Sequence, residues 1–463
     1  MKEFCGVYGI YSYDKDNLSK SVYYGLYALQ HRGQESAGIA VADGKTIKIH
    51  RGMGLCAVVF NEEILSSLAP GHIASGHVRY STTGSSTIEN AQPIVMDTKY
   101  GPIAFSHNGN IVNSDELKDE LKYEGHAFKG SSDSEIMALI IASSKEPTIE
   151  KAILEMVNKS HGAFSLVIMT KDKLIGLRDP NGLRPLCLGK LGDQYIISSE
   201  TAALDVLGAH FVRDISNGEM IIIDKTGVHS TIYAPRAKKS LCAFEFIYLA
   251  RPDSRMDGRS VYEARVTMGK CLAKQNKVDA DIIIGVPDSG IAAAIGYAQE
   301  SKIPFTEGLI KNRYIGRTFI QPSQAIRSLG VKLKLNPIKE VVRGKKLVVI
   351  DDSIVRGTTS KQIVKILQDA GAREVHMRIS SPPILYPCFY GIDTPSRSEL
   401  IASSMSIDSV AKFLEADSLA YLSIRDLVNS ISLPKGSLCL ACLNGDYCVE
   451  LPEKLKNLNL IFK

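Results

Sequence analysis

Residues 347–362, LVVIDDSIVRGTTSKQ, decide the fold of the second half of the chain. The run LVVI is apolar and mostly β-branched without interruption, which is typical of a strand buried on both faces of a parallel sheet. Two aspartates follow it, then a turn with glycine and threonine, and then a helical pattern over residues 359–372. The stretch therefore predicts a strand, a polar turn and a helix in direct succession.

This arrangement suits a sugar phosphate. A helix N-terminus presents free N–H groups and a partial positive charge, so backbone amides and hydroxyls of residues 356–359 could hold a phosphate. Asp351 and Asp352, at the end of the strand, could accept hydrogen bonds from ribose hydroxyls. The alternative is simple helix capping by Thr358 or Thr359 beside an incidental acidic pair.

A second strand end repeats the pattern in residues 282–294, IIIGVPDSGIAAA. Its turn, PDSG, opens another predicted helix and is suited to a diphosphate and its Mg²⁺, although the same letters also describe an ordinary capped turn. Two such turns at the carboxyl ends of parallel strands form the crevice where open α/β sheets bind ligands. Between them, residues 311–346 hold ten Lys or Arg and one acidic residue, a charge run that elsewhere marks a solvated face or a nucleic-acid patch.

The two turns together resemble the signature of type I phosphoribosyltransferases. The resemblance implies an α/β domain that binds phosphoribosyl diphosphate, with a loop at whose base lie Lys311, Arg313 and Tyr314. It implies the following binding residues: Asp288, Ser289, Lys311, Tyr314, Asp351, Asp352, Ser353, Arg356, Gly357, Thr358 and Thr359. Mg²⁺ would be held mainly by the diphosphate and ribose oxygens, with Ser289, Asp351 and Asp352 nearby.

The first half has a different rhythm. Short alternating strands such as SAGIAVA (36–42) and FSLVIMT (164–170) recur with few helical stretches between them, which predicts antiparallel sheet with helices beside it. The polar link YAPRAKKS (233–240) separates this rhythm from the strand-and-helix alternation that follows. We expect domains over residues 5–234 and 235–463, the second ending in a cysteine-rich tail.

Five segments of the first half belong together: CGVYGI (5–10), LQHRGQESAGIA (29–40), GHVRYSTTG (76–84), SHNGNIVN (106–113) and SSDSEIMA (131–138). They resemble the glutaminase domain of class II amidotransferases, an N-terminal-nucleophile hydrolase with an αββα sandwich. A terminal cysteine carries a thiol and an α-amine with a pKa of ~7.7 to 8.0 that can act as general base. An amide-linked cysteine lacks that base, so residues 1–4 are expected to be a propeptide. Without this context, Cys5 would be an ordinary buried strand cysteine.

The same resemblance implies roles in glutamine hydrolysis. Asn108 and the backbone N–H of Gly109 would form the oxyanion hole. Arg79 would pair with the α-carboxylate of glutamine and Asp133 with its α-ammonium group. Tyr80 would shape the pocket, and Arg32 would lie beside the nucleophile, in contact with either thiol or substrate. Singly, a turn or solvated surface charges would explain each of these residues.

Nine cysteines in a long chain without an export signal point to thiols or ligands rather than to disulfides. Cys439 and Cys442 have the C-x-x-C spacing of a metal clip. From spacing, Zn²⁺, an iron–sulfur centre and unligated core cysteines are equally good interpretations. Resemblance to propeptide-bearing relatives implies a 4Fe-4S cluster on Cys242, Cys388, Cys439 and Cys442, with Cys448 as a competitor.

Taken as a whole, the chain resembles amidophosphoribosyltransferases, which use glutamine and phosphoribosyl diphosphate to make 5-phosphoribosylamine, pyrophosphate and glutamate in the first committed step of purine synthesis. The resemblance also implies feedback inhibition by purine nucleotides and a homo-oligomer, a dimer or homotetramer. The composition, with 44% hydrophobic and 23% charged residues and no apolar run near 20 residues, predicts a protein that does not span a membrane. The missing export signal and the cysteine usage predict a cytoplasmic location, and the resemblance implies no nucleic-acid partner.

Relatives with two other functions offer alternative interpretations of this sequence. A purine regulator that binds phosphoribosyl diphosphate without catalysis would explain the second half and the basic run, but it would carry a DNA-binding domain where this chain has the predicted nucleophile. An enzyme that makes glucosamine phosphate would share the first half, but it would carry sugar-isomerase domains in place of VIDDSIVRGTTS. Release of pyrophosphate from glutamine and phosphoribosyl diphosphate separates the three.

Overall fold

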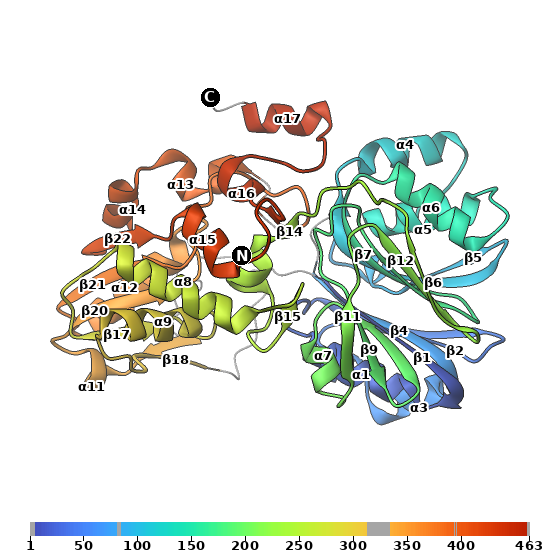
Figure 1. The fold of residues 1–463 in the computed structure, drawn as a ribbon, viewed down its shortest axis with the longest axis horizontal. Helices are drawn as coiled ribbons and strands as arrows, with labels where there is room; N and C mark the ends of the chain where they lie inside the picture. The colour runs from blue at the N-terminus through green and yellow to red at the C-terminus, as the bar shows by residue number, and fades with distance from the viewer. Residues whose placement is uncertain (1–4, 81–84, 313–333, 393, 395, 461–463) are drawn as a thin grey trace.

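The chain folds into two halves that lie side by side, as the computed structural model shows for residues 5–80, 85–312, 334–392, 394 and 396–460 (Figure 1). The elements from β1 to β13 form the first half, and those from β14 onward form the second. The predicted boundary between residues 234 and 235 falls in the segment that joins β13 to β14.

Two antiparallel sheets make up the centre of the first half. The seven-stranded sheet has the order β11-β9-β10-β1-β4-β2-β3 and the six-stranded sheet the order β13-β12-β8-β7-β6-β5. The strands of the first are β1 (Gly6–Asp16), β2 (Ser36–Ala42), β3 (Ile47–Met53), β4 (Gly71–Arg79), β9 (Cys187–Leu191), β10 (Gln194–Ser198) and β11 (His210–Asp214). Those of the second are β5 (Ile94–Thr98), β6 (Gly101–Ile111), β7 (Gly162–Met169), β8 (Leu174–Arg178), β12 (Glu219–Asp224) and β13 (Gly227–Ile232).

Helices cover the outer face of each sheet. An apolar core joins the seven-stranded sheet to α1 (Leu18–Ala28), α2 (Cys56–Val59), α3 (Glu62–Leu68) and α7 (Ala202–Asp205). Another joins the six-stranded sheet to α4 (Ser114–Tyr123), α5 (Asp133–Ser143) and α6 (Ile149–Lys159). A third core lies between the two sheets, which is why β7 is buried along its whole length. The predicted αββα sandwich is confirmed; one 3-10 turn, η1 (Ile88–Asn90), completes it.

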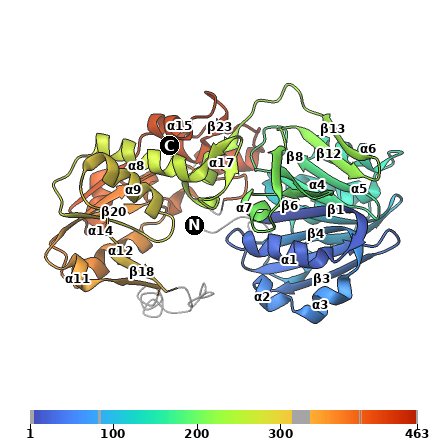
Figure 2. The ribbon, with the colours of Figure 1, turned by 60° about the horizontal axis from the view of Figure 1, so that its bottom comes forward.

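A four-stranded parallel sheet, β17-β20-β21-β22, forms the centre of the second half. Its strands are β17 (Ile282–Gly285), β20 (Lys346–Asp351), β21 (Glu374–Ile379) and β22 (Ser418–Tyr421). One face packs on α8 (Val261–Gln275), α9 (Ile291–Ser301) and α15 (Ile424–Ile431), and the other on α12 (Thr358–Asp369) and α14 (Ile407–Leu414). Figure 2 shows α8 and α9 on the side of the sheet opposite α12. The predicted parallel α/β domain is confirmed.

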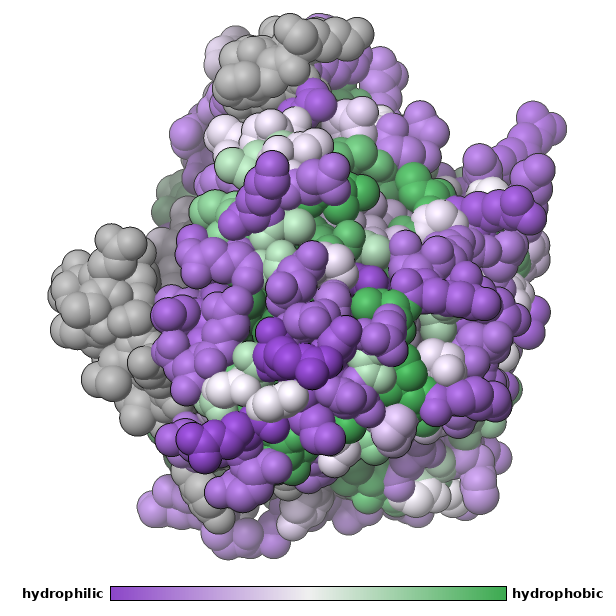
Figure 3. All heavy atoms as spheres, turned by 90° about the vertical axis from the view of Figure 1, so that its left-hand side faces the viewer, coloured by the Kyte–Doolittle hydropathy of each residue, from purple (hydrophilic) through white to green (hydrophobic). Residues whose placement is uncertain are grey.

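Short elements connect these layers. They are β14 (Leu241–Cys242), the π-helix η2 (Glu245–Leu249), β15 (Arg255–Met256), β16 (Arg259–Ser260), β18 (Leu309–Lys311), β19 (Leu335–Pro337), α11 (Lys339–Val342), η3 (Arg397–Glu399), α13 (Ile401–Ser404), β23 (Leu438–Cys439), α16 (Ala441–Asn444) and α17 (Glu453–Leu460). β14 pairs with β23, so the chain end returns to the start of the second half. Hydrophilic side chains dominate the outward face of this half (Figure 3). Of the helices described, none has the length and apolarity that crossing a bilayer requires.

Candidate active sites

Cys5 lies immediately before β1, in the interior of the first half between its two sheets. Its side chain is 9% exposed, and its thiol donates a hydrogen bond to the carbonyl oxygen of Tyr80 over 3.5 Å. Burial raises the pKa of the Cys5 thiol, and the nearby charge of Arg79 acts against that rise. The thiol is therefore neutral near pH 7 and needs a base before it can attack. The predicted propeptide, residues 1–4, lies outside the described residues.

Arg79, Tyr80 and Asp133 surround the same point. Arg79 ends β4 and is 2% exposed, and Asp133 is the first residue of α5 and is 5% exposed. Charges on both residues act on the pKa of Cys5, in opposite directions. One carboxylate oxygen of Asp133 accepts from the backbone N–H of Ile111 at 3.1 Å. The structure thus brings together a buried cation, a buried anion and the thiol, as the sequence predicted.

The predicted oxyanion-hole residues follow each other in β6. Asn108 is fully buried, yet neither its Nδ2 nor its Oδ1 has a hydrogen-bond partner among the described residues. Gly109 has a φ of 151°, and a side chain there would come within 1.9 Å of the Ala163 carbonyl oxygen, so only glycine fits. A buried amide without partners costs about 1–3 kcal/mol per unsatisfied group. Unsatisfied buried groups of this kind are expected where a bound ligand supplies the missing hydrogen bonds.

Two histidines connect β4 to β6 behind this pair. Nε2 of His77 donates to the carbonyl oxygen of His107 at 2.9 Å, and Nδ1 of His107 lies 3.0 Å from the hydroxyl of Ser134. Burial lowers the pKa of His77 to about 3 and also lowers that of His107. Both rings are neutral near pH 7, so they fix the spacing between Arg79 and Asn108 without adding charge. Neither histidine was predicted from the sequence, although both lie within the segments GHVRYSTTG and SHNGNIVN.

Arg32 is held beside Cys5. Its Nε donates to the main-chain carbonyl of Cys5 at 3.1 Å, while its two terminal nitrogens reach the carboxylates of Glu200 and Glu245. Arg32 therefore contacts the backbone of Cys5 rather than its thiol. Glu200 and Glu245 were not predicted; the signal for Glu245 was a single acidic residue inside the apolar run CAFEFIYL, where a buried charge needs a partner.

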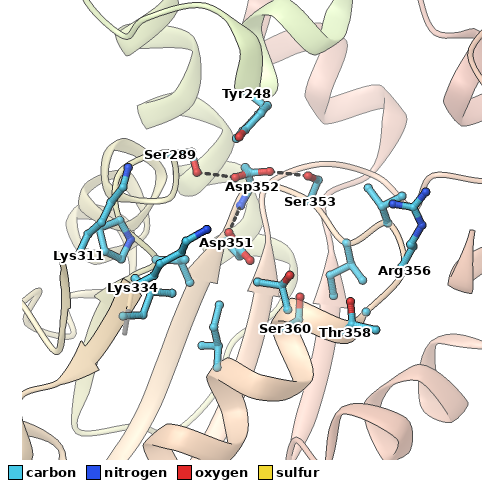
Figure 4. A pocket seen from close by; sticks show the side chains of 18 of the residues that line it. Tyr248, Ser289, Lys311, Lys334, Asp351, Asp352, Ser353, Arg356, Thr358 and Ser360 are labelled. Carbon is cyan, nitrogen blue, oxygen red and sulfur yellow. Dashed lines mark hydrogen bonds between the residues drawn. The ribbon is translucent and has the colours of Figure 1, made fainter. Parts of the chain in front are cut away.

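A pocket of about 660 Å³ opens at the carboxyl end of the parallel sheet (Figure 4). The predicted residues that line it are Ser289, Lys311, Asp351, Asp352, Ser353, Arg356, Gly357, Thr358 and Thr359. Sequence reasoning did not find Tyr248 and Lys334, nor Gln30, Gln34 and Leu55 of the first half, which also line it. Asp288 lies at its edge and pairs with Lys311 at 2.6 Å. Tyr314 and Arg313 lie outside the described residues.

The two aspartates form the acidic floor of this pocket. The hydroxyls of Ser289 and Ser353 both donate to Asp352, and the backbone N–H of Asp352 donates to a carboxylate oxygen of Asp351 at 2.9 Å (Figure 4). Burial raises the pKa of both carboxyls, and the charge of Asp352 raises that of Asp351 further. A pair of this kind favours a cation or several hydroxyl donors.

The start of α12 faces the same space. Gly357 precedes the helix with a φ of 74°, a conformation that suits glycine, and Thr358 and Thr359 begin the first turn. Their N–H groups form the positive end of the helix and can bind an anion. The guanidinium of Arg356 pairs with Glu399, and Arg356 is also among the residues that line the pocket.

Cysteines from three segments gather where the two halves meet. Cys242 of β14 stands opposite Cys439 of β23, and the carbonyl of Cys442 accepts from the backbone N–H groups of residues 385 and 386, which brings Cys388 close. All five thiols in this region, including that of Cys448, are free. Burial raises the pKa of Cys242 to about 12 and raises that of Cys388, while the charge of a buried arginine acts against both shifts.

Five thiols here are a soft donor set, which suits zinc or iron and sulfur. No three His, Cys, Asp or Glu side chains among the described residues are placed to hold a single ion. Zn²⁺ would bring its four sulfurs within about 3.8 Å of one another, because each Zn–S bond is ~2.3 Å long. The amide of Tyr390 already donates to the sulfur of Cys388 at 3.4 Å, the kind of contact that stabilises a ligating thiolate.

Comparisons with known proteins cover both halves. A family model described as a glutamine amidotransferase domain matches residues 77–206, and one described as a phosphoribosyl transferase domain matches residues 264–380. The amidophosphoribosyltransferase of Synechococcus elongatus is 50% identical over 468 residues, covering 100% of this chain and 94% of its own. That of Methanocaldococcus jannaschii is 49% identical over 464 residues, covering 96% and 98%.

A solved structure is similar along almost the whole chain. It is glutamine phosphoribosylpyrophosphate amidotransferase from B. subtilis, complexed with ADP and GMP, with a TM-score of 0.91 and 47% identity over 97% of this chain and 98% of that one. A structure described as the allosteric regulatory enzyme of purine biosynthesis has a TM-score of 0.92, also at 47% identity, and covers 97% of each chain.

Proposed function

The chain belongs to the amidophosphoribosyltransferase family, and we propose that its two sites divide the family's reaction, one releasing ammonia from glutamine and the other accepting it. The reaction is glutamine-dependent amidotransfer to phosphoribosyl diphosphate in purine biosynthesis, which makes the chain a glycosyltransferase. The observation that carries the division of labour is the pocket beside Asp351 and Asp352, which is lined on its other side by residues of the half that contains Cys5.

Ammonia release begins at Cys5. After removal of residues 1–4, the α-amine of Cys5 takes the thiol proton, and the sulfur attacks the side-chain amide carbon of glutamine. The negative oxygen that forms is stabilised by the unpartnered amide of Asn108 and the backbone N–H of Gly109. Ammonia leaves with a proton from the amine, and water then cleaves the thioester to give glutamate. The raised pKa of the buried thiol supports this reading, because it makes an adjacent base necessary.

Selection of free glutamine falls to the charges around the thiol. Arg79 is proposed to bind the α-carboxylate by two hydrogen bonds, Asp133 the α-ammonium group, and Tyr80 to shape the pocket. Both charged side chains are at least 95% buried, so a substrate that left either unpaired would bind poorly. A peptide-bound glutamine lacks both charges and is therefore excluded.

The acceptor pocket is proposed to bind phosphoribosyl diphosphate. The start of α12 holds the 5-phosphate, Asp351 and Asp352 accept from the ribose hydroxyls, and Ser289, Asp288 and Lys311 lie on the diphosphate side. Mg²⁺, which prefers oxygen ligands and often bridges substrate phosphates, fits beside Ser289 and the two aspartates and would neutralise the leaving diphosphate. The nitrogen bonds to C1 of the ribose as pyrophosphate departs, giving 5-phosphoribosylamine.

We further propose that Cys242, Cys388, Cys439 and Cys442 hold a 4Fe-4S cluster with a structural role. The support is their convergence from three segments and their free thiols. Cys448 is next to Cys439, whose hydrogen bond lowers its pKa, and it remains the alternative ligand. When bound, the cluster would join the C-terminal segment to the start of the second half.

Regulation and assembly are proposed from the relatives. The B. subtilis structure is a complex with ADP and GMP, and another similar structure is described as an allosteric regulatory enzyme, so we propose that purine nucleotides inhibit this chain. We also propose a homo-oligomer, a dimer or tetramer, on the family resemblance alone.

The deciding experiment compares the chain with Cys5→Ser and with Cys56→Ser, a buried cysteine of the α2 core. The unchanged chain should lose residues 1–4, as intact mass reports, and release glutamate and pyrophosphate in equal amounts. Cys5→Ser should lose turnover with glutamine but keep turnover with ammonium salts, while Cys56→Ser keeps both. Full glutamine turnover in Cys5→Ser, or in a chain that retains residues 1–4, would refute the proposal.

A further inference from the structure

Four buried charges meet where the two halves of the chain touch. Three belong to the first half and one to the second: Arg32, Arg184, Glu200 and Glu245, of which none is more than 1% exposed. Two are positive and two negative, so the group is neutral as a whole. Leaving one such charge unpaired is costly, and a pair this deeply buried is rarely worth more to stability than well-packed apolar residues.

Arg32 is the centre of the group, and all three of its guanidinium nitrogens are used. One terminal nitrogen donates to Glu200 at 2.5 Å and to Glu245 at 3.0 Å, and the other donates to Glu245 at 2.9 Å. Glu245 thus binds Arg32 in the two-pronged manner that fixes the plane of a guanidinium. With the plane fixed, the direction of the remaining Nε–H is fixed as well.

That Nε–H points at the main chain of the predicted nucleophile. It donates to the carbonyl oxygen of Cys5 at 3.1 Å. Once residues 1–4 are removed, no preceding peptide restrains Cys5, and a tilt of the peptide plane between residues 5 and 6 would displace amine and thiol together. The hydrogen bond to the carbonyl opposes that tilt, because it fixes the peptide plane and with it the Cα atom that carries both groups.

We propose that Glu245, although it belongs to the phosphoribosyltransferase half, is a positioning residue for Cys5 and acts through Arg32. This role rests on the proposed function of Cys5 as the nucleophile. Glu200 assists from the first half, and it is itself fixed by the hydroxyl of Ser254 at 2.6 Å and the backbone N–H of Arg251 at 3.0 Å, both from the second half. Each half therefore supplies one carboxylate, Glu200 or Glu245, that accepts hydrogen bonds from the other half.

The element that carries Glu245 also reaches the other site. Glu245 begins the π-helix η2, and Tyr248, three residues on, lines the pocket of Asp351 and Asp352 (Figure 4). π-Turns often occur at functional sites. Arg265 of α8 ties both ends of η2 down, through the carbonyls of residues 246 and 250 at 2.8 Å each. A glutaminase half without η2 would lack the partner that orients Arg32.

The experiment uses the full-length, processed chain and the substitutions E245Q and E245D, with E219Q as matched control. Glu219 is also 1% exposed and also binds an arginine, Arg213, through both oxygens at 2.6 and 2.9 Å, but on β12. The measurements are kcat and KM for glutamine hydrolysis, pyrophosphate release supported by ammonium salts, and the rate at which iodoacetamide alkylates Cys5. E245D keeps the charge on a shorter side chain, so it still tests the position of the carboxylate if E245Q does not fold.

We expect kcat for glutamine hydrolysis to fall about 100-fold in E245Q, since misplacing a reacting group by ~1 Å costs that much. KM should change little, because the contacts to glutamine remain. Alkylation of Cys5 should slow, ammonium-supported turnover should hold, and E219Q should match the unchanged chain in every rate. E245D should lie between the two.

Glutamine kcat at the unchanged level in both Glu245 variants would overturn the positioning role and leave the proposed function standing. An equal fall in glutamine-dependent and ammonium-dependent turnover would also overturn the positioning role, because it indicates damage to the whole fold. If the unchanged chain itself does not hydrolyse glutamine, the proposed function fails and the positioning role fails with it.

Discussion

Replacing Asn108 by alanine should separate catalysis from stability. The side chain is fully buried and both of its polar atoms lack partners among the described residues. Each such group destabilises the folded state by about 1–3 kcal/mol. Alanine removes both and leaves a space of roughly 30 Å³, which costs about 0.7 kcal/mol at ~24 cal/mol per Å³. The free energy of unfolding should therefore stay level or rise by about 1 kcal/mol or more.

The kcat for glutamine hydrolysis should fall, although the stability does not. Loss of one oxyanion donor lowers kcat by about 10²–10³, equivalent to ~2.7–4 kcal/mol. The assay is glutamate release by the processed enzyme, beside urea unfolding of the same preparation. Asn110→Ala is the control on the same strand: its Nδ2 donates to the carbonyl of Phe389 at 2.9 Å. That variant should lose about 1 kcal/mol of stability and keep its kcat.

Two results would refute the reasoning. If Asn108→Ala keeps its kcat within about threefold of the unchanged chain, the amide does not stabilise the transition state, because a lost donor costs far more than that. If it loses more than about 2 kcal/mol of stability, the amide has a partner in the free protein that offsets its burial.

Three further results are expected. Asp352→Asn should raise KM for phosphoribosyl diphosphate at least about tenfold, the loss of ~1.4 kcal/mol of charge-assisted binding, and an unchanged KM in a pyrophosphate assay would contradict the pocket assignment. His77 has a folded pKa of about 3 against 6.5 in its ordinary state, so the unfolded chain binds the extra proton and stability falls as pH drops below 6.5. From pH 7 to 5 the loss should be about 2 kcal/mol in urea unfolding, and His77→Gln should remove that part of the loss; equal losses in both would argue against it. Cys388→Ser should lower bound iron and sulfide in anaerobic preparations, Cys271→Ser should not, and equal metal content in the two would count against the cluster.

Local patterns predicted the fold well because they report local geometry. The run SAGIAVA became β2 with the same bounds, and the strand, turn and helix of residues 347–362 became β20, which ends at Asp351, and α12, which begins at Thr358. Alternation of apolar residues fixes which face of a strand is buried, and a glycine such as Gly357 marks where a helix can begin. These features depend on neighbours within a few residues.

Contacts between distant segments could not be predicted in the same way. Arg32 and Glu245 are 213 residues apart and belong to different halves, and nothing in either local sequence names the other. The pairing of Arg356 with Glu399 is a second example, since the two residues are 43 apart and neither local sequence names the other. Burial makes Glu245 conspicuous within CAFEFIYL, but a conspicuous charge does not reveal its partner.

Arg184 joins the buried charges of the interface to the segment that carries Cys388. Its Nη1 lies 3.5 Å from Glu245, and its Nη2 donates to the carbonyl of Tyr390 at 2.5 Å, two residues after Cys388. The apolar cluster around Tyr390 draws residues from both halves, and Cys388, Cys439 and Cys448 pack against it. The guanidinium of Arg184, which lies beside the carboxylate that binds Arg32, is thus fixed by the segment that carries Cys388. A group that binds those thiols would therefore also hold the charges that orient Arg32, and with them the main chain of Cys5.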